Sequence, residues 1–201
     1  MKFSKIISYF FHPINFPIIG TILFFLYIPK FIFKPQEHII IAVIFIGTYI
    51  FPILLLWLMK RFEMIKSYHM VTIEERKFPL LLFISLSFII GHWLYKSKIV
   101  DLLSLFFFGY GLSLLCVYLF LYRKIKISLH TLAISGLIGF LVYFSYSYKI
   151  NLIMILAILF VLAGLVGSTR LKLRAHQLNE VLLGGLIGIS AQFLVYFIYM
   201  M

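Results

Sequence analysis

Long apolar runs alternate with short polar segments along the whole chain. A membrane-spanning helix needs roughly 20 consecutive apolar residues, and several runs approach that length. We predict spans at residues 17–33, 38–59, 79–95, 99–122, 128–146, 150–167 and 178–200. Pro29 and Lys30 interrupt the end of the first run. Pro52 is expected to kink the second, because a proline inside a helix leaves a carbonyl without its backbone donor.

The composition is that of an integral membrane protein. Apolar residues make up 64% of the sequence and charged residues 12%, whereas soluble domains contain about 25% charged residues. The mean hydropathy is +1.11. The predicted fold class is an all-α, polytopic transmembrane helical bundle of about six to seven spans. Because little sequence remains outside the spans, one integral membrane domain is expected over residues 1–201.

Several function classes are disfavoured by the remaining composition. The single Cys116 lies in an apolar run, so an intrachain disulfide and a thiolate metal site are excluded. The His residues lack clustered carboxylate or thiolate partners, so neither a metal nor another cofactor is expected. The net charge of +12 comes mainly from short loops, where topology and lipid head groups explain it better than nucleic acid does. The first 16 residues predict an interfacial lead-in without a cleaved signal peptide.

Basic residues are distributed unequally between the two sides of the membrane. One side, which includes the N-terminus, carries Lys2, Lys5, Lys60, Arg61, Lys66, Arg76, Lys77, Arg123, Lys124, Lys126, Arg170, Lys172 and Arg174. The other side carries Lys30, Lys34, Lys96, Lys98 and Lys149. The richer side is predicted to be cytoplasmic. The bias persists when Arg76, Lys126 and Arg170 are set aside as possible ligands, and a bacterial inner membrane is the expected location.

Three polar segments fall on this predicted cytoplasmic side, and the third carries the clearest chemistry. Arg170, His176 and Glu180 lie between the last two apolar runs. If a helix begins near residue 178, His176 and Glu180 are one turn apart, so the carboxylate can fix the imidazole tautomer. An imidazole held in this way can act as a nucleophile or a base. The alternative is a basic loop that only sets topology.

The other two segments add cations and a second imidazole. Lys126, Ser128 and His130 follow the fourth run, and Arg76 follows the second. Two imidazoles, one beside a carboxylate, together with fixed cations suit phosphoryl transfer: one His attacks phosphorus, the other protonates the leaving oxygen, and cations hold the phosphate oxygens. Alternatively, Ser128 or His130 caps a helix, and the cations only snorkel to the membrane surface.

The third segment resembles the last motif of the type 2 phosphatidic acid phosphatase superfamily, Ser-Arg, then His after five residues and Asp after three more. Thr169-Arg170, His176 and Glu180 fill those places. Residues 127–131, Ile-Ser-Leu-His-Thr, resemble the family's Pro-Ser-Gly-His-Thr, and the family's Lys and Arg-Pro motif is matched only loosely at Arg76. The resemblance covers about residues 72–188, the motif-bearing core.

This resemblance implies a role for each matched residue. It implies that His176 is the nucleophile that forms a phosphohistidine, that Glu180 orients it, and that His130 is the general acid. Arg170 and Ser128 would bind the phosphate, together with Arg76 if the first motif is real. The position of the family's lysine is occupied in this sequence by His69, near Lys66. Lys126 is our candidate for the residue that replaces this lysine.

The sequence also departs from the family pattern. Glu180 replaces an aspartate and has a longer reach, which a small helix shift could absorb. Leu129 replaces a glycine whose lack of a side chain lets backbone N–H groups approach phosphate, so this loop needs a different shape. Pro79 stands three residues after Arg76, where the family has proline directly after arginine.

The expected function is a phosphatase acting on a phosphorylated membrane lipid, such as phosphatidic acid, phosphatidylglycerophosphate or a polyprenyl diphosphate. One alternative is a lipid or anion translocase, for which the charge of Arg170 would matter and the imidazole of His176 would not. The other is a noncatalytic membrane protein of the same fold, in which neither His130 nor His176 would support turnover.

Overall fold

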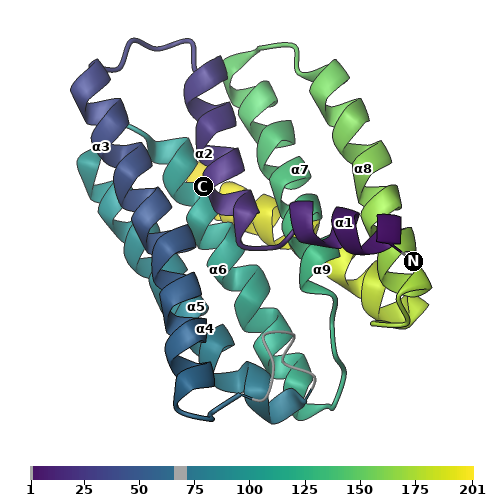
Figure 1. Cartoon of the computed structure of the whole chain (residues 1–201). Helices are drawn as coiled ribbons and strands as arrows, with labels where there is room; N and C mark the ends of the chain where they lie inside the picture. Colours follow the sequence, from purple (N-terminus) through teal and green to yellow (C-terminus); the bar gives the residue numbers. More distant parts are fainter. Residues whose placement is uncertain (1, 66–71) are drawn as a thin grey trace.

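The structure is a computed structural model that describes residues 2–65 and 72–201, with side chains described from residue 4 onward. The described part is helical and contains no strand (Figure 1). Its elements are α1 (Lys2–Phe10), α2 (Asn15–Tyr27), α3 (Lys34–Phe45), the π-helical turn η1 (Ile46–Ile50), α4 (Phe51–Arg61), α5 (Ile73–Ser97), α6 (Asp101–Tyr122), α7 (Leu129–Tyr148), α8 (Ile153–Lys172) and α9 (Leu178–Met200).

Six helical segments among the described residues are long and apolar enough to cross a membrane. They are the continuous segment Lys34–Arg61, which joins α3, η1 and α4, and the single helices α5 to α9. These six segments match the second to seventh predicted spans. The all-α bundle of about six to seven spans is confirmed, and the protein is an integral membrane protein.

The first predicted span, residues 17–33, is shorter in the structure. Helix α2 has 13 residues and ends at Tyr27, before Pro29. At 1.5 Å per residue it is about 20 Å long, whereas the hydrocarbon core is about 30 Å thick. A bend of 59° separates α2 from α1, and only this bent pair taken together would make a seventh span.

Pro52 is accommodated by a local widening of the helical turn that precedes it. The π-helical turn η1 comes directly before α4, which has Pro52 at its start. A proline ring clashes with the carbonyl four residues earlier, which here belongs to Thr48, and a π turn relieves such crowding within a continuous helix. The Thr48 hydroxyl donates to the Ile44 carbonyl oxygen at 2.8 Å.

Helix α5 begins earlier than the sequence pattern predicted. The Thr72 hydroxyl accepts a hydrogen bond from the Glu75 backbone nitrogen, and the Glu75 carboxylate accepts one from the Thr72 nitrogen, both at 3.3 Å. This capping box starts the helix at Ile73 and leaves Pro79 inside it. Arg76 therefore belongs to the first turn of a helix and not to a loop.

Small residues let α9 cross α7 at very short range. A β-carbon at Gly184 would lie 2.5 Å from the Thr131 hydroxyl oxygen and 2.7 Å from the Ser128 carbonyl oxygen. A β-carbon at Gly188 would lie 2.9 Å from the Gly136 nitrogen and closer still to the Leu132 oxygen. This contact fixes the first turns of α7 and α9 against each other, and those turns carry the second and third motifs.

Substitution of Gly188 tests the importance of this crossing. Gly188→Ala is expected to destabilise the protein by about 1–3 kcal/mol, because the backbone atoms that meet the new methyl group cannot move aside as side chains can. The matched control is Gly164→Ala in α8, where a β-carbon meets nothing within 4 Å. The measurement is the thermal unfolding midpoint of both variants in one detergent. Equal midpoints for the two variants would contradict the prediction.

Candidate functional site

The connection between α8 and α9 places the third motif. Helix α8 ends at Lys172, and Arg174 adopts a left-handed backbone conformation with φ 51°. The Ala175 nitrogen donates to the Arg170 carbonyl oxygen at 3.1 Å, which closes the turn after the helix. Helix α9 then begins with a capping box between Gln177 and Glu180. The chain therefore reverses within a few residues, with His176 at the turn.

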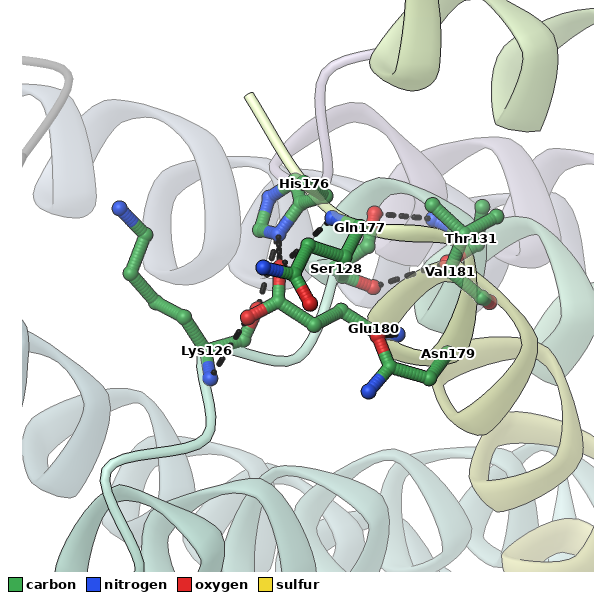
Figure 2. Close-up of polar contacts among 8 residues, drawn as sticks. All are labelled: Lys126, Ser128, Thr131, His176, Gln177, Asn179, Glu180 and Val181. Carbon is green, nitrogen blue, oxygen red and sulfur yellow. Dashed lines mark hydrogen bonds and ion pairs between the residues drawn. The ribbon is translucent and has the colours of Figure 1, made fainter. Parts of the chain in front are cut away.

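His176 is held by two acceptors on the same ring nitrogen. Its Nδ1 lies 2.8 Å from the Lys126 carbonyl oxygen and 3.0 Å from Glu180 Oε2 (Figure 2). A carbonyl oxygen cannot donate, so Nδ1 carries a proton and donates to both. In the neutral ring, Nε2 then bears the free electron pair. The residue is only 8% exposed, so the imidazole is packed in one orientation.

Burial also sets the charge state of His176. Desolvation lowers the pKa of this imidazole below its ordinary value, and the neighbouring charges of Arg170 and Arg76 lower it further. The hydrogen bond to Glu180 raises the pKa; this effect is smaller than that of desolvation but larger than that of either arginine. His176 is therefore neutral at pH 7, which is the form in which Nε2 can attack an electrophile.

Glu180 is the centre of a set of backbone contacts. Its Oε1 accepts from the Lys126 nitrogen at 3.2 Å, and its Oε2 accepts from the Gln177 nitrogen at 3.1 Å as well as from His176. Its carbonyl oxygen accepts from the Ser128 nitrogen at 3.2 Å. The glutamate lies in the first turn of α9 and curls back over its own helix start. This capping position accounts for the longer side chain that the sequence has here.

The second motif contributes mainly through its main chain and its helix cap. The Ser128 hydroxyl accepts from the Thr131 nitrogen at 3.5 Å and is fully buried, so the structure gives Ser128 the capping role. Leu129 packs against the hydrophobic core and lines a narrow crevice, which replaces the open backbone that a glycine would leave. Thr131 Oγ1 donates to the Val181 carbonyl oxygen at 3.1 Å. The motif thus ties α7 to α9.

His130 and Arg170 meet at a residue that the sequence did not single out. Arg170 Nη1 donates to the Ser8 hydroxyl at 2.6 Å. His130 Nε2 lies 3.2 Å from the Ser8 carbonyl oxygen and 3.3 Å from its hydroxyl oxygen. The ring of His12 meets the ring of His130 edge-on, with 5.5 Å between centroids. Ser4, Ser8 and His12 recur every four residues, and this polar stripe is the signal that could have placed α1 at the site.

Lys126 and Arg76 add positive charge around His176. Desolvation lowers the pKa of the Lys126 amine, and the nearby charge of Arg76 lowers it further. Arg76 is therefore within electrostatic reach of both Lys126 and His176. In Figure 2 the Lys126 side chain extends away from the Glu180 carboxylate, while its backbone holds Glu180 and His176. His69 and Lys66, the other residues of the loose first motif, lie outside the described residues.

The three predicted segments thus meet at one end of the bundle. The structure brings together His176, Glu180 and the Lys126 backbone, and it joins His130 to Arg170 through Ser8. Among the described residues, no three His, Cys, Asp or Glu side chains form a group suited to a metal ion. No protein-family model, curated protein or solved structure matches the chain.

Proposed function

We propose that the protein is a metal-independent phosphatase that hydrolyses a lipid phosphate or diphosphate through a phosphohistidine on His176. The observation that carries this proposal is the double anchoring of His176 Nδ1 by Glu180 and the Lys126 carbonyl oxygen. It leaves a neutral Nε2 as the one ring nitrogen available for attack. The cations Arg170, Arg76 and Lys126 supply the positive charge that a phosphoryl group needs as it transfers.

In the first chemical step, the Nε2 electron pair attacks phosphorus and the bond from phosphorus to the leaving oxygen breaks. His130, in its protonated form, gives its Nε2 proton to that oxygen, so the lipid alcohol or lipid monophosphate leaves neutralised by one proton. Glu180 stabilises the positive charge that develops on the His176 ring while phosphorus is attached. Arg170 holds the phosphoryl oxygens.

In the second step, a water molecule attacks the phosphohistidine and the bond from phosphorus to Nε2 breaks. The neutral His130 left by the first step now takes a proton from the water, which restores both imidazoles to their starting forms. The net reaction consumes one water and releases inorganic phosphate. No oxidant, reductant or further group is required.

The surroundings of Arg76 support a substrate with an apolar tail. Arg76 lies at a narrow crevice of about 20 Å³ whose other walls are apolar. These walls are formed by Pro79, Leu80, Phe83, Val117, Leu121 and Leu129. This volume holds about one water molecule and no hydrocarbon chain, so the tail would lie in the surrounding bilayer. A cation among apolar side chains of α5, α6 and α7 suits the anionic head group of such a lipid. Phosphatidic acid, phosphatidylglycerophosphate and polyprenyl diphosphates share this chemistry.

The test of the proposal is phosphate release from a panel of these lipids by the purified protein in detergent, with a metal chelator present. We expect turnover of at least one lipid that survives chelation. Folded protein that releases no phosphate from any lipid, yet moves labelled lipid between leaflets in vesicles, would replace the proposal with the translocase. Folded protein that does neither would leave the noncatalytic alternative.

We also propose that the site faces the cytoplasm of a bacterial inner membrane, on the basis of the lysine and arginine bias. The end of α9 lies away from the site, because Tyr199 and Met200 line a pocket with Asp101 and Lys149 at the far ends of α6 and α7. The C-terminus is therefore expected to lie outside the cytoplasm, and a reporter fused to it is expected to show activity on that side of the membrane. Cytoplasmic activity of that reporter would reverse the proposed orientation.

The pH dependence of turnover gives a further prediction. Because the pKa of His176 is lowered, kcat/KM is expected to rise with pH through an acid limb below about pH 6.5, the ordinary value for histidine. The Glu180 hydrogen bond raises the pKa, so Glu180→Gln should move the limb to still lower pH while reducing the rate. The substrate phosphate titrates near pH 6 but identically for both proteins. If Glu180→Gln leaves the acid limb at the same pH or moves it to higher pH, the assignment of this limb to His176 is contradicted.

A further inference from the structure

The N-terminal helix lies across the candidate site. Figure 1 shows α1 running across α7 and α8, at a steep angle to both. Ile7 faces inward and is 6% exposed, whereas Ile6, Tyr9 and Phe10 are 54%, 80% and 69% exposed. The helix thus turns Ile7 towards the bundle and exposes an apolar face formed by Ile6, Tyr9 and Phe10. Ser8 follows Ile7 and reaches the two groups to which the proposed mechanism assigns the phosphate oxygens.

Ser8 offers acceptor oxygens to both of these groups. Its hydroxyl oxygen accepts from Arg170 Nη1 at 2.6 Å, and its carbonyl oxygen lies 3.2 Å from His130 Nε2. A carbonyl can only accept, so the His130 proton is on Nε2, the atom that the mechanism needs for the leaving oxygen. Two oxygens of one residue therefore satisfy the donors that two phosphate oxygens would otherwise satisfy.

A phosphate bound by Arg170 and protonated by His130 needs the space that the Ser8 oxygens fill. Arg170 also has a second donor, Nε, which is buried and has no hydrogen-bond partner among the described residues. Buried donors of this kind are rare and point to a missing acceptor. An incoming phosphate offers more acceptor oxygens than Ser8 does, and its charge strengthens each bond to arginine.

We propose that Ser8 is a latch: it occupies the position of phosphate oxygens between Arg170 and His130, and α1 moves away when a lipid phosphate binds. This inference rests on the proposed function, since that function assigns phosphate to these two residues. The bilayer surface is the partner that receives the released helix, through the exposed side chains of Ile6, Tyr9 and Phe10. The Ser8 latch therefore keeps the site closed until a lipid phosphate displaces Ser8 from Arg170 and His130.

The connection between α1 and α2 is built as a hinge. The two helices meet at 59° across His12 and Pro13. The Asn15 side-chain nitrogen donates to the Phe10 carbonyl oxygen at 2.9 Å, and the Tyr110 hydroxyl donates to the Pro13 carbonyl oxygen at 3.3 Å. The second bond ties the start of α2 to α6. Residues after Pro13 thus stay attached to the bundle while α1 swings.

The experiment compares two substitutions with opposite expected effects. Ser8→Ala removes the hydroxyl acceptor, so inorganic phosphate is expected to bind about tenfold more tightly, the size of one hydrogen bond to a charged group. Ser8→Asp places a carboxylate beside Arg170, and phosphate is expected to bind at least about tenfold more weakly for the same reason. Phosphate binding is measured by phosphorus NMR titration in detergent, and kcat/KM for the lipid substrate is expected to follow the same order.

The control variants are Asn151→Ala and Asn151→Asp, at an exposed position before the start of α8 and at the opposite end of that helix from Arg170, where neither phosphate binding nor kcat/KM should change. Weaker phosphate binding by Ser8→Ala would overturn the latch and make Ser8 a substrate ligand. Equal binding by all variants, or no phosphate binding by any of them, would also overturn it. If no lipid is hydrolysed but the two Ser8 variants shift phosphate binding in opposite directions, the proposed function fails and the latch over an anion site stands.

Discussion

His176→Ala is expected to lower kcat for the lipid substrate by at least about 10³-fold, which corresponds to about 4 kcal/mol of activation free energy. The loss is this large because the covalent intermediate cannot form without Nε2, and the remaining groups act only in concert with it. The measurement is phosphate release together with detection of an acid-labile phosphoryl group on the protein. Wild type is expected to carry this group during turnover, and the variant is not.

The alanine variant also removes a structural contact, since Glu180 and the Lys126 carbonyl oxygen lose their donor. His176→Asn is the companion variant, because its side-chain amide can still donate a hydrogen bond but cannot carry the phosphoryl group. It should be as inactive as the alanine variant and more stable. His92→Ala, at an exposed position of α5 far from the site, should keep full activity. A phosphoryl group that persists on the His176→Asn protein would refute the role of this imidazole.

Replacement of His130 is expected to affect substrates according to their leaving groups. General acid catalysis contributes about 10²- to 10⁴-fold, so His130→Asn should cost this much with a lipid phosphomonoester, whose alcohol leaves poorly without a proton. The loss should be less than about tenfold with an alkyl-substituted aryl phosphate, because a phenolate needs little protonation to leave. The measurement is the ratio of kcat/KM for the two substrates in wild type and variant. An equal loss for both would show that His130 serves binding or structure and not proton transfer.

The features that the sequence predicted correctly are those carried by local spacing. Six of the predicted spans appear because an apolar run of sufficient length is itself the determinant of a membrane helix. His176 and Glu180 meet because they are separated by one helical turn. The gathering of His130 and Arg170 at the same end follows from the even number of spans between their loops. Each of these features follows from residues that are close together in the sequence or from the number of spans between two loops.

The features that the sequence did not predict depend on partners far apart in the chain. Ser8 contacts residues 122 and 162 positions away. The spacing of Ser4, Ser8 and His12 indicates a polar helix face but does not identify those partners. Lys126 was expected to act through its amine, but its backbone holds Glu180 and His176, and a backbone contact leaves no trace in residue type. The early start of α5 is instead a local feature: the capping box between Thr72 and Glu75 lies before the apolar run that predicted the span, and it places Arg76 on a helix.

The anchoring of Glu180 has a consequence for how far such a site can diverge in sequence. The backbone nitrogens of Lys126, Ser128 and Gln177 all donate to this one residue, and any amino acid except proline supplies such a donor. Substitution at Lys126 and Gln177 can therefore change the side chain and keep these backbone bonds to Glu180, whereas the Ser128 hydroxyl also caps α7. A chain that retains the histidine and the carboxylate can preserve the same arrangement through long evolutionary drift, with little residue identity left in the loops that build it.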